Sequence, residues 1–188
     1  GKWQASSNKE TYEVINPANE EVIGRASKAT PEDVNRALKS AEQGLEVWKK
    51  TSPWKRSSVI RKIADLIRAK QDVLAKWITL EVGKPFLEGK GEVGATADIF
   101  EWNSEETKRI YGQTVESRFE DTRIHVYYQP IGVVAAMSPW NFPLVLSGRK
   151  ISTALAAGCS VIIKPDVIAP GGVMELVDIC REAGVPPG

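Results

Sequence analysis

The sequence is poor in the residue types that metal centres and nucleophilic triads use. It contains 2 cysteines and 1 histidine among 188 residues. These cannot complete a zinc site without a carboxylate, and so small a cysteine count does not make a disulfide framework. A Ser-His-Asp triad would have to use His125. We therefore expect no metal site, and chemistry that depends on a cofactor, on amides and carboxylates, or on residues outside the chain.

Charge of one sign and long apolar runs are also missing. The 25 Lys and Arg balance 24 Asp and Glu, which gives no electrostatic reason to expect nucleic acid or an anionic membrane as a partner. No apolar run approaches the roughly 20 residues that cross a bilayer. Residues 1–14 lack the apolar core of a signal peptide, so we expect a cytoplasmic protein. With 42% hydrophobic and 26% charged residues, the composition is that of a globular domain.

Local patterns predict two short strands and then three helices before residue 113. Apolar runs at 13–15 and 21–23 flank a turn. Thr30-Pro31-Glu32-Asp33 starts a helix with a hydroxyl N-cap, a proline and two acids, and Ser52-Pro53 repeats that start. Trp48 and Trp77 lie on the apolar stripes of these helices, which predicts core positions. The helices are expected at 30–48, 52–83 and 88–111.

The pattern changes to alternating strands and helices after Gly112. Residues 123–128 alternate like a half-buried strand, with His125 in a structural position. Residues 131–137 and 160–163 are continuous apolar runs, typical of parallel strands buried on both faces. A helix at 142–157 joins them, and another follows at 173–183. The fold class we predict is therefore α/β: a partial doubly wound, Rossmann-like parallel sheet with N-terminal helices.

Two polar segments follow the two parallel strands, at the sheet edge where ligands bind in such folds. The first is 138–143, and the second begins at Lys164. Asn141 fits two roles, an amide donor to an oxyanion or a cap of the next helix. Lys164 fits binding of a phosphate or a ribose hydroxyl, or simple solvation. The G-x-G-x-x-G dinucleotide fingerprint does not occur.

The cysteines favour structural roles. Cys180 falls on an apolar helix face, where an unpaired cysteine behaves as a small hydrophobe. Cys159 leads into a buried strand, and no cation lies close in sequence to activate it apart from Lys164 on the same strand. Catalysis by Cys159 stays as a minor alternative.

An ordered set of segments resembles the aldehyde dehydrogenase superfamily from about Asn16 to the end of the chain. The most specific part is Pro139-Trp140-Asn141-Phe142-Pro143, followed by Ala156-Ala157-Gly158-Cys159 and Lys164-Pro165. The remaining segments are Leu80-Glu81-Val82-Gly83-Lys84-Pro85, Gly91-Glu92-Val93, Pro130-Ile131-Gly132-Val133-Val134, Arg149-Lys150 and Glu182-Ala183-Gly184-Val185-Pro186.

The resemblance implies oxidation of an aldehyde through a cysteine thiohemiacetal, hydride transfer to NAD or NADP, and hydrolysis of the thioester. By position, Asn141 would donate its amide to the oxyanion. Ser138 and Trp140 would line the cofactor cleft, and Lys164 would bind the adenosine ribose. Lys150 corresponds to a lysine tied to proton relay in some members only.

Two departures from the family pattern matter. The acid that grips both ribose hydroxyls is usually a Glu at the position of Val167, whereas here the acid is Asp166, one place earlier. Loss of that Glu should weaken selectivity for NAD and remove repulsion of a 2′-phosphate, so the choice between NAD and NADP stays open. The family's nucleophilic cysteine and general-base glutamate would lie beyond Gly188, and Cys159 corresponds to a non-catalytic position.

We therefore expect an incomplete enzyme whose isolated chain is inactive. Its expected parts are the strands and helices of the cofactor-binding domain at 1–112, an oligomerisation strand segment at 113–129, and the first βαβα part of the dinucleotide-binding domain at 130–188. The expected partners are an aldehyde and, in the full-length protein, further copies of itself. The alternative is a non-catalytic half-domain that binds a nucleotide or pairs with another chain.

Overall fold

A computed structural model describes residues 3–188; residues 1 and 2, which begin the first predicted segment, lie outside the described residues. No helix in the described part of the chain is both long and apolar enough to span a membrane. The order of elements is β1 (Thr11–Ile15), β2 (Val22–Ser27), α1 (Pro31–Trp48), α2 (Pro53–Ala69), α3 (Gln71–Val82), α4 (Phe86–Thr107), β3 (Gln113–Glu116), β4 (Arg123–Val126), β5 (Val133–Met137), α5 (Pro143–Ala157), β6 (Ser160–Lys164) and α6 (Gly171–Ala183).

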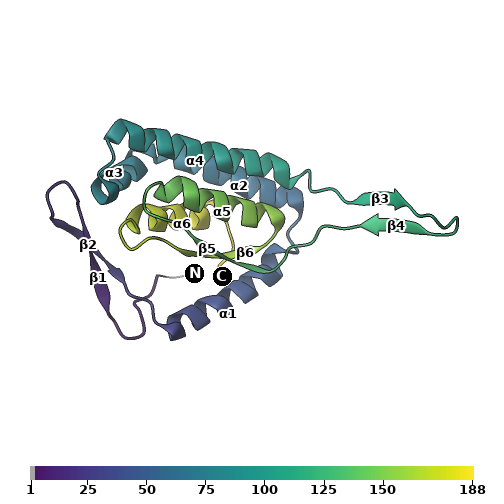
Figure 1. The fold of residues 1–188 in the computed structure, drawn as a ribbon, viewed down its shortest axis with the longest axis horizontal. Helices are drawn as coiled ribbons and strands as arrows, with labels where there is room; N and C mark the ends of the chain where they lie inside the picture. Colours follow the sequence, from purple (N-terminus) through teal and green to yellow (C-terminus); the bar gives the residue numbers. More distant parts are fainter. Residues whose placement is uncertain (1–2) are drawn as a thin grey trace.

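The elements of the main body form layers around the parallel pair β5–β6 (Figure 1). Helix α1 covers one face of the pair, α5 covers the other, and α6 packs beside α5. Helices α2, α3 and α4 pack on the outer side of α5 and α6. The apolar core lies between these two helical layers, with Ile63, Phe100 and Leu176 among its fully buried side chains. The predicted α/β fold class is confirmed.

The single helix predicted at 52–83 is wrong, because the chain forms two helices that meet at Lys70. This residue caps the end of α2 and the start of α3 with φ −100° and ψ 21°. Its Nζ lies 3.1 Å from carboxylate oxygens of both Glu175 and Glu182 on α6. The apolar stripe runs through the bend because both helices bury the same side against the core, so periodicity alone did not reveal the break.

The first two strands pair antiparallel across the turn expected between them, and β5 and β6 pair parallel as predicted. Burial of the parallel strands on both faces is wrong. In β5 only Ala136 is buried, whereas the side chain of Met137 is 64% exposed. Within the described residues each of these strands pairs along one edge only, and their second face is covered by α1 alone. The strands β5 and β6 therefore contain more apolar residues than this chain buries.

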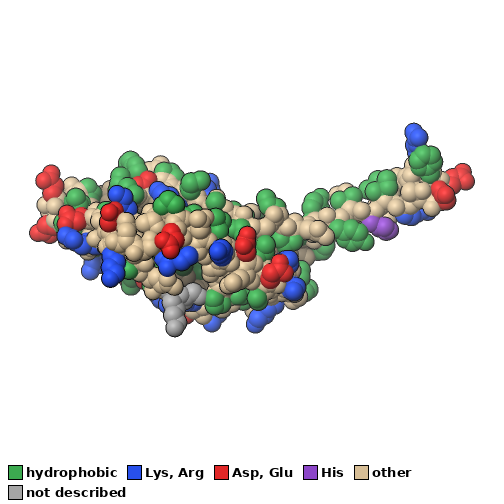
Figure 2. Space-filling model, turned by 90° about the horizontal axis from the view of Figure 1, so that it is seen from below, with side chains coloured by type: hydrophobic (Ala, Val, Ile, Leu, Met, Phe, Trp, Pro, Cys, Tyr) green, Lys and Arg blue, Asp and Glu red, His purple; other side chains and the backbone are tan. Residues whose placement is uncertain are grey.

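Strands β3 and β4 form a hairpin arm that projects away from the main body (Figures 1 and 2). Every residue of both strands is exposed, so the prediction of a half-buried strand at 123–128 is wrong. The alternation itself is real: Val115 pairs with Ile124 on one face, and Thr114 pairs with His125 on the other. His125 Nδ1 lies 3.2 Å from Thr114 Oγ1. The arm has an apolar face that no other element among residues 3–188 covers.

Candidate functional site

The two predicted polar segments meet at one edge of the parallel pair. Met137, the last residue of β5, is in register with Lys164, the last residue of β6. Both strands therefore deliver their following loops to the same side of the fold, as expected for a parallel pair. This confirms that the structure brings residues 138–143 and 164–167 together at the carboxyl edge.

Ser138 is the best anchored residue of the first loop. It is buried, and its Oγ lies 2.7 Å from Ser147 Oγ on α5. Gly148, the next residue of α5, lies so close to α4 that a Cβ there would come within 2.8 Å of Thr96 Cγ2. The start of α5 is thus held on two sides. Trp140, two residues after Ser138, is exposed, which leaves its indole available to a ligand.

Asn141 does not cap α5. The N-cap position is Phe142, and no side chain of the capping residue bonds the helix. Instead Glu92 on α4 supplies the cap: its Oε1 accepts hydrogen bonds from the backbone N–H of Leu144 at 2.9 Å and of Val145 at 3.3 Å. The capping interpretation of Asn141 is therefore wrong, and its exposed side chain remains free to act as an amide donor.

Lys84 connects the Asn141 turn to that cap. Its Nζ donates to Glu92 Oε2 at 2.5 Å and to the backbone carbonyl of Asn141 at 3.2 Å. The same ammonium group lies 3.7 Å from the centre of the Phe142 ring. Glu92 is buried, so its charge needs these partners to offset the cost of desolvation.

The second loop carries two charged residues, an exposed Lys164 and a half-buried Asp166. Lys164 is exposed at the end of β6, and Val167 is exposed three residues later. Between them, Asp166 Oδ1 accepts a hydrogen bond from Ile168 N at 3.1 Å, so one carboxylate oxygen shapes the turn. A lysine donor and a carboxylate acceptor in one loop are groups that can bind ribose hydroxyls, and the exposed side chain of Lys164 is open to a nucleotide.

Glu81 on α3 caps the N-terminus of α6, the helix that follows this loop. Its two oxygens accept from Gly171 N at 2.6 Å and Gly172 N at 3.2 Å. Burial raises the pKa of Glu81 to about 7, although both N–H bonds oppose that rise. The pKa of Tyr12 on β1 is also raised, first by burial and then by the charges of Glu81 and Asp166. Tyr12 in the first hairpin therefore lies within electrostatic range of both Glu81 and Asp166.

Lys150 is not joined to the Asn141 turn by any contact among the described residues. It is exposed, and its Nζ donates to Leu146 O one turn earlier in α5, at 3.3 Å. The structure therefore adds no support to a proton-relay role for it.

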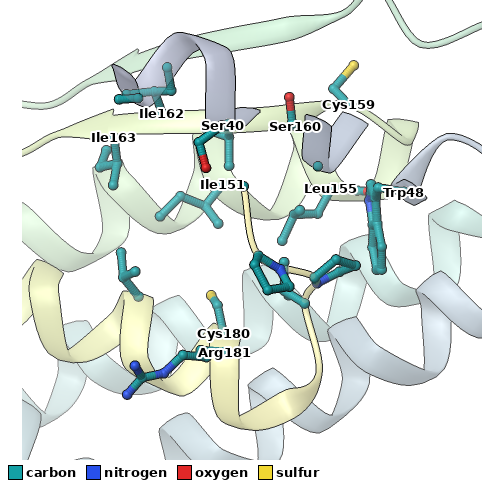
Figure 3. A pocket seen from close by; sticks show the side chains of 18 of the residues that line it. Ser40, Trp48, Ile151, Leu155, Cys159, Ser160, Ile162, Ile163, Cys180 and Arg181 are labelled. Carbon is teal, nitrogen blue, oxygen red and sulfur yellow. The ribbon is translucent and has the colours of Figure 1, made fainter. Parts of the chain in front are cut away.

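One cavity lies away from the two loops at the carboxyl edge. It measures about 380 Å³ and lies between α1, β6, α6 and residues 185–188 (Figure 3). Cys180 points toward it and Cys159 points away from it. Burial raises the pKa of Cys180 to about 12, which makes its thiol an inert hydrophobe. None of the predicted site residues is among its described lining residues.

Arg56 is the cation near Cys159 that sequence spacing did not reveal. Its side chain is buried, and its Nη1 donates to Thr51 O at 2.7 Å. Burial lowers the pKa of Arg56, and its proximity to Cys159 opposes that shift. Cys159 is itself only 2% exposed, so a substrate does not reach it in this structure.

Sequence and structural comparisons agree on one family for this arrangement. The aldehyde dehydrogenase family matches residues 3–188. This chain belongs to the aldehyde dehydrogenase family. It is 42% identical over its whole length to glutarate-semialdehyde dehydrogenase of Pseudomonas putida, and 44% identical over 99% of its length to succinate semialdehyde dehydrogenase of Acinetobacter baylyi. It covers 39% and 38% of those two proteins.

Solved structures match the fold of the chain equally closely, among them an aldehyde dehydrogenase from Brucella melitensis with a TM-score of 0.98 and 37% identity over the whole chain. The crystal structure of an Escherichia coli NADP-dependent enzyme superposes on the whole chain with a TM-score of 0.98 and 40% identity, over 39% of that enzyme. The chain therefore spans about two fifths of the length of the aldehyde dehydrogenases that it resembles. Membership in the family, which the sequence motifs indicated, is confirmed.

Sequence reasoning missed the roles of Glu81, Glu92 and Lys84. A signal was present, because both glutamates occupy stripe positions: Glu81 follows Leu74 and Ile78 on the buried face of α3, and Glu92 neighbours Val93 on that of α4. A carboxylate on a buried stripe requires hydrogen-bond donors. Which donors they are could not be read from the sequence, because they lie 52 residues from Glu92 and 90 from Glu81.

Proposed function

We propose that this chain is the N-terminal portion of an NAD(P)-dependent aldehyde dehydrogenase, and that Asn141 supplies the side-chain amide of its oxyanion hole. The observation that carries the proposal is the Asn141 turn: the amide is exposed at the carboxyl edge of β5, while its main chain is held from behind by Lys84. An amide donor loses no proton when it stabilises an oxyanion, so it suits this role.

Residues at the edge would divide the work as follows. Trp140 and Lys164 would hold the dinucleotide, whose nicotinamide accepts the hydride when it is bound. Asn141 would donate to the oxygen that becomes negative when a thiolate adds to the aldehyde. The thiolate and the general base would come from residues that follow this chain in the whole enzyme. The isolated chain is expected to form no NAD(P)H.

The test uses the full-length protein and its Asn141→Ala variant, assayed for NAD(P)H formation. The substrates are succinate and glutarate semialdehyde, which are named for relatives. We expect kcat to fall about 100- to 1,000-fold, the usual cost of losing one oxyanion donor. Asn19→Ala, at an exposed asparagine in the β1–β2 turn, is the matched control. A wild-type rate in Asn141→Ala would refute the oxyanion role.

Cofactor selectivity tests the second loop independently. We propose that Val167 leaves the enzyme permissive toward the 2′-phosphate, because an acid is missing there. Val167→Glu should then raise the ratio of kcat/KM with NAD to that with NADP, since a carboxylate accepts from ribose hydroxyls and repels phosphate. Ile168→Glu, an exposed neighbour, is the control. An unchanged ratio in Val167→Glu would contradict the proposal.

The hairpin arm favours self-association of the full-length protein. We propose that the apolar face formed by Val115, Ile124 and Val126 is covered by another subunit. A two-stranded sheet that exposes an apolar face is a typical site of protein association. The alternative of a non-catalytic pairing module shares this feature. The coding sequence after Gly188 separates the two: an open frame that encodes a cysteine-bearing domain supports the enzyme, and a stop codon supports the module.

A further inference from the structure

Lys84 makes three contacts that converge on the turn containing Asn141. Its Nζ bonds the Asn141 carbonyl, pairs with Glu92 Oε2, and lies over the Phe142 ring. All three contacts use one ammonium group, whose side chain is only 12% exposed. The group therefore has a fixed position, unlike a lysine that moves freely in solvent.

Glu92 links Lys84 to the N-terminus of α5. One of its oxygens binds Lys84, and the other accepts from the first free N–H groups of α5 at Leu144 and Val145. The Asn141 main chain is thus held from both directions: Lys84 binds its carbonyl, and Glu92 fixes the helix that begins two residues later. Without this pair the Asn141 turn would lose its contacts to Glu92 on α4 and to Lys84 in the connection between α3 and α4.

We propose that Lys84 is a positioning residue for the reaction, which sets the direction of the Asn141 amide through the Asn141 carbonyl and the Glu92 cap. This inference rests on the proposed oxyanion role of Asn141. Oxyanion stabilisation depends steeply on donor placement, and a displacement of about 1 Å can cost about 100-fold in rate. A residue that touches neither substrate nor cofactor can therefore change kcat strongly.

Lys90 is a matched control within the same region. It also pairs with an acid, with Nζ 2.8 Å from Asp72 Oδ1, and its ammonium lies 5.8 Å from the centre of the Phe86 ring. Its contacts stay among α3 and α4 and do not reach the Asn141 turn. Replacing either lysine by Met keeps the length of the side chain and removes the charge and the N–H donors.

The experiment is a double-mutant cycle in the full-length protein with Lys84→Met, Asn141→Ala and the combination. We expect Lys84→Met to lower kcat at least about tenfold while the KM for NAD(P) changes less than about twofold. In the Asn141→Ala background, Lys84→Met should lower kcat no further, because the amide through which it acts is gone. Lys84→Arg, which keeps charge and donors, should recover most of the rate, and Lys90→Met should match the wild type.

Two kinetic results would overturn the inference: wild-type kcat in Lys84→Met, or the same fall in both backgrounds, which would show a general structural effect. Hydrogen exchange of the backbone amides of residues 141, 142, 144 and 145 adds a readout that does not depend on turnover. Lys84→Met should speed it and Lys90→Met should not; unchanged exchange in Lys84→Met also refutes the positioning. Failure of the proposed function is distinct, since the wild type would then lack aldehyde oxidation or Asn141→Ala would retain it.

Discussion

Glu81 Oε1 accepts a hydrogen bond from Gly171 N at 2.6 Å, which joins the end of α3 to the start of α6 across 90 residues of sequence. The contact is tight enough to require glycine at its other end. A Cβ at Gly171 would lie 2.6 Å from Trp77 Cε3 and 2.8 Å from Glu81 Oε1. The buried carboxylate thus takes the helix N-terminus that an anionic ligand would otherwise occupy.

The first prediction is that Glu81 makes stability fall as pH rises. Burial raises its pKa from 4.5 to about 7, so the folded state binds a proton that the unfolded state has already lost. The free energy of unfolding should therefore decrease between pH 4.5 and about 7 and level off above, by about 3 kcal/mol for this group. Urea denaturation across this pH range measures the slope.

Glu81→Gln should remove that part of the slope, because glutamine does not titrate. Glu42→Gln, an exposed position in α1, is the control and should keep the wild-type slope. If Glu81→Gln and the wild type show the same pH dependence, the raised pKa of Glu81 is contradicted.

Glycines in two packed helices should respond in opposite ways to alanine. Gly148→Ala would place a Cβ 2.8 Å from Thr96 Cγ2 and 3.3 Å from Phe100 Cε2, so we expect a loss of about 1–3 kcal/mol from overpacking. A Cβ at Gly94 in α4 meets nothing within 4 Å. Gly94→Ala should therefore stabilise by about 0.5–1 kcal/mol through helix propensity. Thermal unfolding of the two variants checks this; a Gly148→Ala variant as stable as the wild type would contradict the close approach of α4 and α5.

Trp48 should tolerate replacement poorly despite its position at the end of a helix. It is 3% exposed, and its Nε1 donates to Leu155 O at 2.9 Å, from α1 to α5. Trp48→Phe removes this hydrogen bond and leaves a small void, while Leu155 O keeps its bond from Gly158 N, so we expect a loss of at least about 1 kcal/mol in urea denaturation. Trp102→Phe, at a tryptophan that is 68% exposed, should change stability by less than about 0.5 kcal/mol.

The hairpin arm should control self-association through one face only. Ile124→Lys places a charge on the apolar face, and we expect a lower sedimentation coefficient for the full-length protein because a buried unpaired charge opposes association. His125→Lys, on the opposite face, should leave the oligomer intact. If the oligomer dissociates in both variants, or in neither, the apolar face of the arm does not specifically form the contact between subunits.

Local features of this protein were determined by the sequence alone. The helix start at Thr30 contains a capping box in which Thr30 and Asp33 bond each other's backbone N–H, all within four residues. The end of α5 at Gly158, where φ is 86°, follows in the same way from glycine's freedom to adopt that conformation. The parallel pairing of β5 and β6 also followed, because a helix of 15 residues joins two apolar runs.

Only the tertiary structure decided which partners the buried charges have and which apolar faces are covered. Three contacts join residues that lie far apart in the sequence. They are the ion pair of Lys70 with Glu175 at the bend, the cap of α5 by Glu92, and the bond from Lys84 to the Asn141 carbonyl. Hydrophobic periodicity reports that a side of a helix or strand is apolar, but it does not identify what packs against that side. For this reason Asn141 could be singled out from its motif, whereas the residues that hold it required the packed fold.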